Sequence, residues 1–138
     1  MAYKALSRKN GLSLCVSTGA RAASEIIRKC VLFAEAVKKM TDGRIDYVPG
    51  HDHVNFTNGS RILSLPNNPA ACRGFTAECV CLDEAAFIEN LDDVIQAIAP
   101  TLTRNPDAEF VMTSTPAGKN GKFYELYQAA LADPEWEV

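Results

Sequence analysis

Residues 78–84 read ECVCLDE, an apolar run that ends in two adjacent carboxylates, Asp83 and Glu84. An uninterrupted apolar run of this kind is typical of a strand that is covered on both faces, as in a parallel sheet. Ligands of open α/β sheets gather at the carboxyl ends of such strands. The two acids therefore stand where a ligand would bind. Because they are adjacent, their side chains leave the strand in different directions.

The flanking sequence alternates between strand and helix patterns. Strands are predicted over residues 12–17, 45–48, 54–57, 61–65 and 108–113, and helices over 2–9, 21–40, 91–99 and 123–132. Asn58-Gly59 between two alternating runs predicts a hairpin whose two turn residues both have positive φ. Pro100 is expected to end the third helix, and Trp136 to open one more strand. Strands that alternate with helices predict an α/β sheet with helices on both faces.

The composition is that of one ordinary domain: 138 residues, with 14 basic and 17 acidic side chains and a net charge of −3. This charge excludes a polybasic nucleic-acid coat, so contact with DNA would need a local basic patch or an assembly of several chains. The sequence has neither an apolar run long enough to cross a bilayer nor the apolar core of a secretory signal. A cytoplasmic protein with no membrane partner is therefore expected.

The five cysteines show no metal-site spacing. Cys15, Cys79 and Cys81 lie in strand-like runs and Cys30 in a helical pattern, which predicts small buried side chains in a reducing compartment. The pair Cys79 and Cys81 could also suggest a metal or redox site. A spacing of one residue suits neither, and core packing is favoured.

The two acids suit nucleoside triphosphate hydrolysis. Asp83 can hold Mg²⁺ through its water shell, and the ion in turn bridges phosphate oxygens. Glu84 can polarise the attacking water as a general base. The alternative is a strand end with two solvated acids.

A second strand, at residues 110–113, ends in the consecutive hydroxyls Thr113, Ser114 and Thr115, followed by Pro and Gly. Hydroxyls at a strand tip beside a γ-phosphate can sense whether that phosphate is present and pass the change to the following loop. The alternative is a plain strand-to-helix turn with a Ser/Thr cap. The two elements together are more specific than either alone.

Two other clusters suggest less. Residues 51–53 (HDH) could bind a metal, but no third ligand follows at the expected spacing, so a loop or hairpin turn is favoured. Glu89, Asp92 and Asp93 could suggest a nuclease cluster. Acids at the start of a helix complement the helix dipole, which is the ordinary explanation.

Taken in order, these segments resemble the ATPase domain of the large subunit of viral and phage terminases, the DNA-packaging motors. The resemblance runs through most of the chain. The matching segments are Ser17-Thr18, residues 58–62 (NGSRI), 65–66 (LP), 73–75 (RGF), 80–87 (VCLDEAAF), 114–118 (STPAG) and 123–126 (FYEL).

The resemblance implies a P-loop NTPase-like three-layer fold with a mainly parallel central sheet and an inserted β-hairpin. It implies an ATPase motor that uses ATP and Mg²⁺ to drive double-stranded DNA into a procapsid in the cytoplasm of a bacterial host. Asp83 would bind the metal, Glu84 would be the catalytic base, and Thr113, Ser114 and Thr115 would couple hydrolysis to movement. The implied partners are DNA, a portal protein, the small terminase subunit and further copies of the chain in a ring.

Three basic residues are weaker candidates. Arg73 would contact a nucleotide phosphate or a neighbouring subunit, although a loop arginine is more often a surface charge. Lys119 and Lys122 could touch DNA phosphates, and the alternative is a solvated turn.

The sequence departs from the family pattern in lacking a G-x-x-x-x-G-K-[ST] phosphate loop. The glycine-rich residues 118–122 (GKNGK) follow the hydroxyl motif, which is the wrong place. We therefore expect residues 1–138 to be a partial ATPase domain, truncated at both ends, without the phosphate-loop strand and without a nuclease domain. Such a chain is predicted to be inactive alone. The alternatives are an inactive prophage remnant and another P-loop DNA translocase or helicase-like ATPase.

Overall fold

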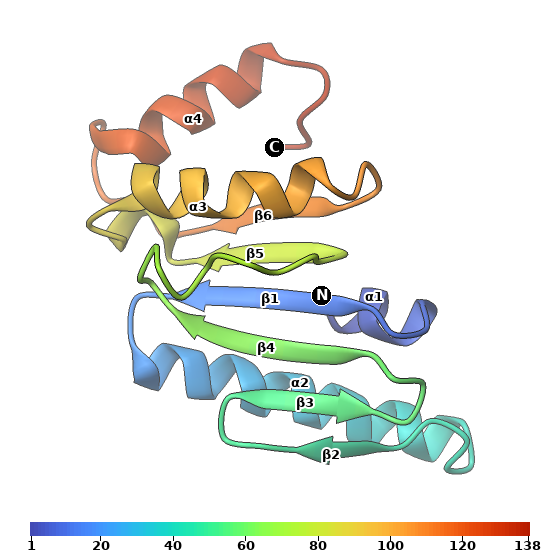
Figure 1. Cartoon of the computed structure of the whole chain (residues 1–138). Helices are drawn as coiled ribbons and strands as arrows, with labels where there is room; N and C mark the ends of the chain where they lie inside the picture. The colour runs from blue at the N-terminus through green and yellow to red at the C-terminus, as the bar shows by residue number, and fades with distance from the viewer.

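The strands form one six-stranded sheet in the order β2-β3-β4-β1-β5-β6 in the computed structural model (Figure 1), which describes residues 1–138 apart from the side chain of Ala20. The strands are β1 (Leu12–Ser17), β2 (Tyr47–Pro49), β3 (His53–Phe56), β4 (Arg61–Pro66), β5 (Cys79–Asp83) and β6 (Glu109–Thr113). The helices are α1 (Ala2–Ser7), α2 (Ala20–Met40), α3 (Leu91–Thr103) and α4 (Gly121–Ala132), with a 3₁₀ turn η1 (Ala85–Phe87).

Strands β4, β1, β5 and β6 are parallel, β3 pairs antiparallel with β4, and β2 pairs antiparallel with β3. The prediction of an α/β fold with a mainly parallel sheet and a hairpin is confirmed. Parallel pairing brings the carboxyl ends of the strands to the same edge of the sheet. Ser17, Asp83 and Thr113 therefore all lie at that edge, which we call the carboxyl edge.

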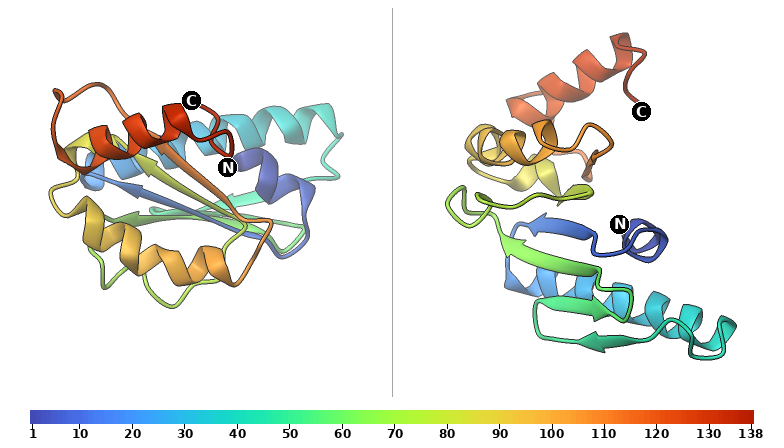
Figure 2. Two further views of the ribbon diagram at one scale, coloured as in Figure 1. Left: turned by 90° about the horizontal axis from the view of Figure 1, so that it is seen from above. Right: turned by 45° about the vertical axis from the view of Figure 1, so that its right-hand side comes forward.

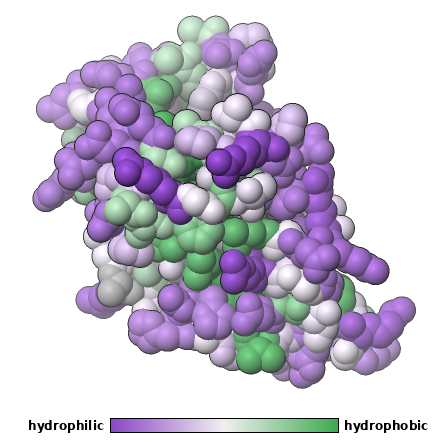
Figure 3. Space-filling model, in the orientation of Figure 1, coloured by the Kyte–Doolittle hydropathy of each residue, from purple (hydrophilic) through white to green (hydrophobic). Residues whose placement is uncertain are grey.

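Helices cover both faces of the sheet. Figure 2 (left) shows α3 on one side and α2 and α4 on the other. Because side chains alternate along a strand, Leu14 and Val16 of β1 join the apolar cluster beneath α3. Ile27 of α2 and Ile62 of β4 belong to a second cluster on the opposite face. On the α3 side, apolar side chains reach the surface in the middle of the face (Figure 3).

The hairpin between β3 and β4 forms at Asn58-Gly59 as predicted, but its turn differs. Only Gly59 of the two has positive φ, 84°. The Gly59 N–H donates to the Phe56 carbonyl at 3.0 Å, and the Phe56 N–H donates to the Ser60 carbonyl at 2.9 Å. These bonds define a three-residue loop with a left-handed glycine rather than a two-residue turn. The expectation of positive φ at both residues was therefore wrong.

The hairpin turn is locked onto the segment that joins α1 to β1. The Ser60 hydroxyl donates to the Arg8 carbonyl at 2.6 Å and accepts from the Gly11 N–H at 2.9 Å. The Asn58 amide donates to the Ala5 carbonyl at 2.9 Å and to the Arg8 carbonyl at 3.0 Å. The Asn58 side chain therefore faces α1. The Asn-Gly pattern in the sequence predicts a turn but does not indicate this anchoring role.

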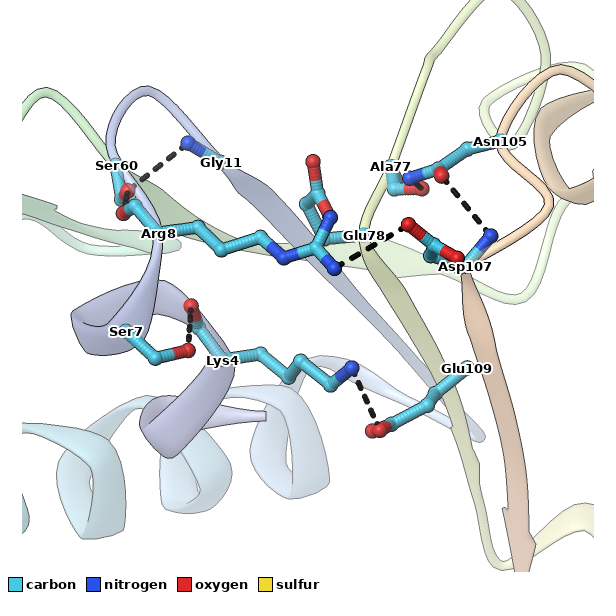
Figure 4. A network of polar contacts seen from close by, with 10 residues as sticks. All are labelled: Lys4, Ser7, Arg8, Gly11, Ser60, Ala77, Glu78, Asn105, Asp107 and Glu109. Atoms are coloured by element: carbon cyan, nitrogen blue, oxygen red, sulfur yellow. Dashed lines mark hydrogen bonds and ion pairs between the residues drawn. The ribbon is translucent and has the colours of Figure 1, made fainter.

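Two ion-pair groups also hold α1 at the amino ends of the strands (Figure 4). Lys4 lies 2.7 Å from Glu109, and Arg8 lies 2.8 Å from Glu78 and 3.5 Å from Asp107. This polar network therefore belongs to the edge of the sheet opposite Asp83 and Thr113.

Helix α3 continues through Pro100 to Thr103, so the prediction that it ends at Pro100 was wrong. Proline removes a hydrogen bond to the carbonyl four residues earlier. Here that residue is Gln96, and both Gln96 and Pro100 are exposed, so water can solvate the carbonyl. The next turn is anchored because Thr101, which is buried, donates its hydroxyl to the Phe75 carbonyl at 3.1 Å.

Trp136 does not open a strand, and that prediction was also wrong. Its N–H donates to the Asp133 carbonyl at 3.1 Å, so the chain turns after α4 instead of joining the sheet. The indole packs edge-on against Phe110 with the ring centroids 6.5 Å apart. This contact between the two rings, rather than backbone pairing, holds Trp136, whose side chain stays 39% exposed.

The two ends of the sheet differ. At one end, β2 has only three residues; it begins two residues later and ends one residue later, on Pro49, than the predicted strand at 45–48. At the other end, the outer edge of β6 faces a groove of about 900 Å³ that also involves α4 and residues 135–138. No helix among the described residues has the length and apolar character needed to span a bilayer.

Candidate functional site

Asp83 and Thr113 lie side by side at the carboxyl edge because β5 and β6 are paired in parallel. They are register partners, and both side chains project from the same face of the sheet. The Thr113 hydroxyl donates to Oδ1 of Asp83 at 3.0 Å. The structure therefore brings together one acid and one hydroxyl that the sequence analysis had singled out in separate motifs.

Glu84 turns the chain sharply out of β5 and into η1. Its backbone is left-handed, with φ 51° and ψ 43°. For a residue other than glycine this conformation costs on the order of 1–3 kcal/mol and persists where the surroundings hold it. The turn sends the Glu84 side chain toward the loop after β6 instead of along the strand.

The Glu84 carboxylate is held by that loop. Its Oε2 atom accepts from the Thr115 N–H at 3.1 Å, from the Thr115 hydroxyl at 3.0 Å and from the Ser114 hydroxyl at 3.4 Å. The Ser114 hydroxyl in turn accepts from the Ala86 N–H at 3.1 Å. Both acids thus bond to the segment 113–115, and η1 is attached to the same segment.

These contacts lower the pKa of Glu84 below its ordinary value. The Thr115 N–H contributes most, followed by the Thr115 hydroxyl, while partial burial opposes them and the Ser114 hydroxyl adds a smaller effect. Hydrogen bonds to the ionised form favour that form. Glu84 is therefore a carboxylate at neutral pH and is ready to accept a proton.

We expect Thr115→Val to raise the pKa of Glu84 part of the way back to its ordinary value, because the hydroxyl is lost while the backbone N–H of residue 115 remains. Since the folded-state pKa is the lower one, the hydrogen bonds stabilise the fold above the ordinary carboxyl pKa, and their contribution disappears as the pH falls through the folded-state value. A ¹³C NMR titration of the Glu84 carboxyl measures the change. Thr115→Ser is the control, since it keeps the hydroxyl. Equal titration of Thr115→Val and the unchanged protein would contradict the assignment.

The oxygen ligands available at Asp83 suit Mg²⁺ better than they suit a metal ion whose ligands all come from the protein. Mg²⁺ commonly takes one or two carboxylates and completes its shell with water and phosphate oxygens. Asp83 with the neighbouring Thr113 hydroxyl can serve such an ion. Among the described residues, no group of three or more His, Cys, Asp or Glu side chains is arranged to hold a metal.

The two clusters set aside in the sequence have structural roles. His53 Nδ1 lies 2.8 Å from Oδ1 of Asp52, and the Gly50 N–H donates to the His53 carbonyl at 2.8 Å, so residues 51–53 belong to the turn between β2 and β3. Asp92 and Asp93 occupy the first turn of α3. Both arrangements agree with the structural alternatives favoured from the sequence.

The basic candidates lie apart from the acids. Arg73 is exposed in the loop between β4 and β5, and within the described part of the chain it makes no hydrogen bond or ion pair. Lys119 is exposed in the loop before α4. Lys122 lies 3.0 Å from Asp92, and this ion pair joins α4 to α3 beside a hollow of about 460 Å³.

Sequence reasoning missed two contributors. The Ala86 N–H carries no side-chain signal, yet it fixes Ser114. Asp92 was interpreted only as a helix-dipole acid, and its partner Lys122 is 30 positions away, so no local pattern connects them. The sequence showed the two adjacent acids, but it did not indicate the 3₁₀ turn at Ala85–Phe87 that follows them.

The comparisons with known proteins concern the fold. No family model matches the sequence. The structure is similar to the large terminase ATPase domain of Thermus phage P74-26, in a mutant form, with a TM-score of 0.75, 21% identity, and coverage of 91% of this chain and 56% of that one. A second structure of that phage domain gives a TM-score of 0.71, 19% identity, and coverage of 91% and 55%. The chain thus spans little more than half the length of these domains, and it shares their fold.

Proposed function

We propose that this chain provides the metal-binding and water-activating part of an ATPase motor that drives double-stranded DNA into a procapsid, as in a large terminase. The observation that carries the proposal is the double attachment at the carboxyl edge: Thr113 bonds to Asp83, and Thr115 bonds to Glu84. An acid pair held by a hydroxyl segment, in a fold shared with a terminase ATPase domain, supports this function more than it supports an unspecialised strand end.

In this proposal each acid has its own task. Asp83 would hold Mg²⁺, which would neutralise charge on the phosphates when ATP is bound. Glu84 orients the attacking water and accepts its proton, and its lowered pKa keeps the side chain in the ionised, proton-accepting form at neutral pH.

The hydroxyl segment connects chemistry to movement. The Glu84 carboxylate is bonded through Oε2 to Thr115 and Ser114, so a rotation or shift of the carboxylate during hydrolysis would change those bonds. Those bonds are the attachment of the loop that leads into α4. We propose that loss of the γ-phosphate alters this attachment and that α4 moves with the loop, while the Lys122–Asp92 ion pair limits the movement.

The sequence has no phosphate-binding loop, so triphosphate must be held by a different polypeptide segment. We propose that residues 1–138 act as part of an ATPase domain and that the strand carrying the loop adds to the outer edge of β6. The groove beside that edge, formed with α4, supports this position. Such subunits would form a ring in the host cytoplasm. There Arg73 would reach a phosphate or a neighbouring subunit, and Lys119 and Lys122 would contact DNA. The ring's other partners would be the portal protein and the small terminase subunit.

An ATP hydrolysis assay tests the proposal. Residues 1–138 alone should release phosphate no faster than buffer with Mg²⁺. The same chain preceded by a strand and phosphate-binding loop should hydrolyse ATP, and Asp83→Asn should abolish that activity by removing the carboxylate that holds the ion. Hydrolysis that is unaffected by Asp83→Asn would overturn the proposed role of the acid pair.

A further inference from the structure

Cys15 and Cys81 face each other across the central strands β1 and β5. They are register partners, between the pairs Leu14–Val80 and Val16–Leu82. Neighbouring strands lie about 4.8 Å apart, which is within the range of Cα separations that a disulfide bridges. Because register partners project from the same face of the sheet, the two thiols lie on the same side of the paired strands.

The two cysteines differ in their exposure to solvent. Cys15 is fully buried, whereas Cys81 is only partly buried. Helix α2 packs on β1, β2, β3 and β4. On the face of the sheet that carries α2, strands β5 and β6 are less covered by it. Val111, the register partner of Cys81 on β6, is 40% exposed. A small oxidant can therefore reach Cys81 from the β6 side, with Cys15 behind it.

Neither a metal nor simple packing accounts for this arrangement. The described residues hold no metal-binding group of three or more ligands, although Cys30 of α2 is near the pair. Packing alone would accept an aliphatic side chain at either position. Cys79 offers an internal comparison, because it is buried on the same strand but its register partner on β1 is Ser13.

We propose that Cys15 and Cys81 are a redox pair that forms a reversible intrachain disulfide on exposure to a peroxide. The Cys81 sulfur attacks one oxygen of hydrogen peroxide, the O–O bond breaks, and the thiol proton leaves with the second oxygen as water. The resulting sulfenic acid is attacked by the Cys15 sulfur, and its hydroxyl leaves with the Cys15 proton as a second water. Two thiols are oxidised by two electrons, and one peroxide is reduced to two waters.

This disulfide would join two interior strands of the sheet, β1 and β5, two residues before Asp83 on β5. The proposal concerns thiol chemistry alone, so it does not depend on ATP hydrolysis. A negative result in the ATPase assay would leave it unchanged.

Peptide mapping tests the proposal on the intact chain. The protein is treated with hydrogen peroxide, its remaining thiols are alkylated in denaturant, and it is digested with trypsin without reduction. We expect the count of free thiols to fall from five to about three and a cross-linked species to appear between residues 10–21 and residues 74–104. Dithiothreitol should restore all five thiols.

Three variants assign the bond. Cys79→Ala should keep the cross-link and leaves Cys81 as the single cysteine of the 74–104 peptide. Cys30→Ala should also keep it, and Cys15→Ala should abolish it. A bond from Cys81 to Cys30, a cross-link between two chains, or oxidation that dithiothreitol does not reverse would each overturn the proposal, as would the absence of any disulfide.

Discussion

In the chain joined to a phosphate-binding loop, Glu84→Gln should lower ATP turnover by roughly 10²–10⁴-fold, the usual contribution of a general base. Glutamine is nearly the same size and keeps a side-chain oxygen that can accept the hydrogen bonds from Thr115 and Ser114. It cannot take a proton from water at neutral pH. The variant therefore removes the base and leaves the attachment of the loop in place. A steady-state phosphate-release assay at saturating ATP measures the effect.

Glu84→Ala is the matched comparison, because it removes both the base and the acceptor. Turnover should fall as far as in Glu84→Gln, and in addition the Thr115 amide should exchange with solvent faster, since its N–H loses its partner. Hydrogen exchange of that amide should be unchanged in Glu84→Gln. Turnover near the unchanged level in Glu84→Gln would mean that Glu84 is not the base, while the fold assignment would stand.

The second large effect is expected in the core. Leu14 is fully buried at the centre of β1, in the cluster that α3 covers. Leu14→Ala removes buried apolar atoms and leaves a cavity between two parallel neighbours that cannot close without breaking their register. We expect the free energy of unfolding to fall by about 2–5 kcal/mol. Domains of this kind are typically stable by only about 5–15 kcal/mol, so the loss is a large fraction of the total.

Leu32→Ala is the control, because the same chemical change is made on α2 at a side chain that is 57% exposed. Alanine is a good helix former, and surface substitutions usually shift stability by less than about 0.5 kcal/mol. Urea unfolding of both variants provides the comparison. If Leu14→Ala were no more destabilising than Leu32→Ala, the central position of β1 in the core would be wrong.

The strands of the parallel core were predictable because their patterns are dictated by burial on both faces. The predicted strand at 12–17 coincides with β1, and the predicted run before Asp83 forms β5. The hairpin was predictable from Asn58-Gly59 because glycine readily adopts positive φ. In each case a local signal and the tertiary environment favour the same structure.

Other features depend on contacts between distant residues. Pro100 stays within α3 because Thr101 is anchored on Phe75, and nothing near Pro100 in the sequence indicates this. The left-handed backbone of Glu84 is compatible with the bonds that its side chain makes to Ser114 and Thr115, 30 and 31 residues later. The sequence therefore singled out Asp83, Glu84 and residues 113–115, whose catalytic and coupling roles stay predictions, whereas the bonds among them required the folded chain.

The unequal ends of the sheet limit how copies of this chain can join edge to edge. β2 is short and finishes on Pro49, which has no N–H to donate, whereas β6 has five residues and a free outer edge. Without the strand that we propose to carry the phosphate-binding loop, two molecules would therefore meet through β6 of each, related by a two-fold rotation, and that contact would occupy the edge where the loop strand would otherwise add. Assembly would stop at a closed dimer. A filament needs a second edge strand that can pair, and Pro49 makes β2 unsuitable for that.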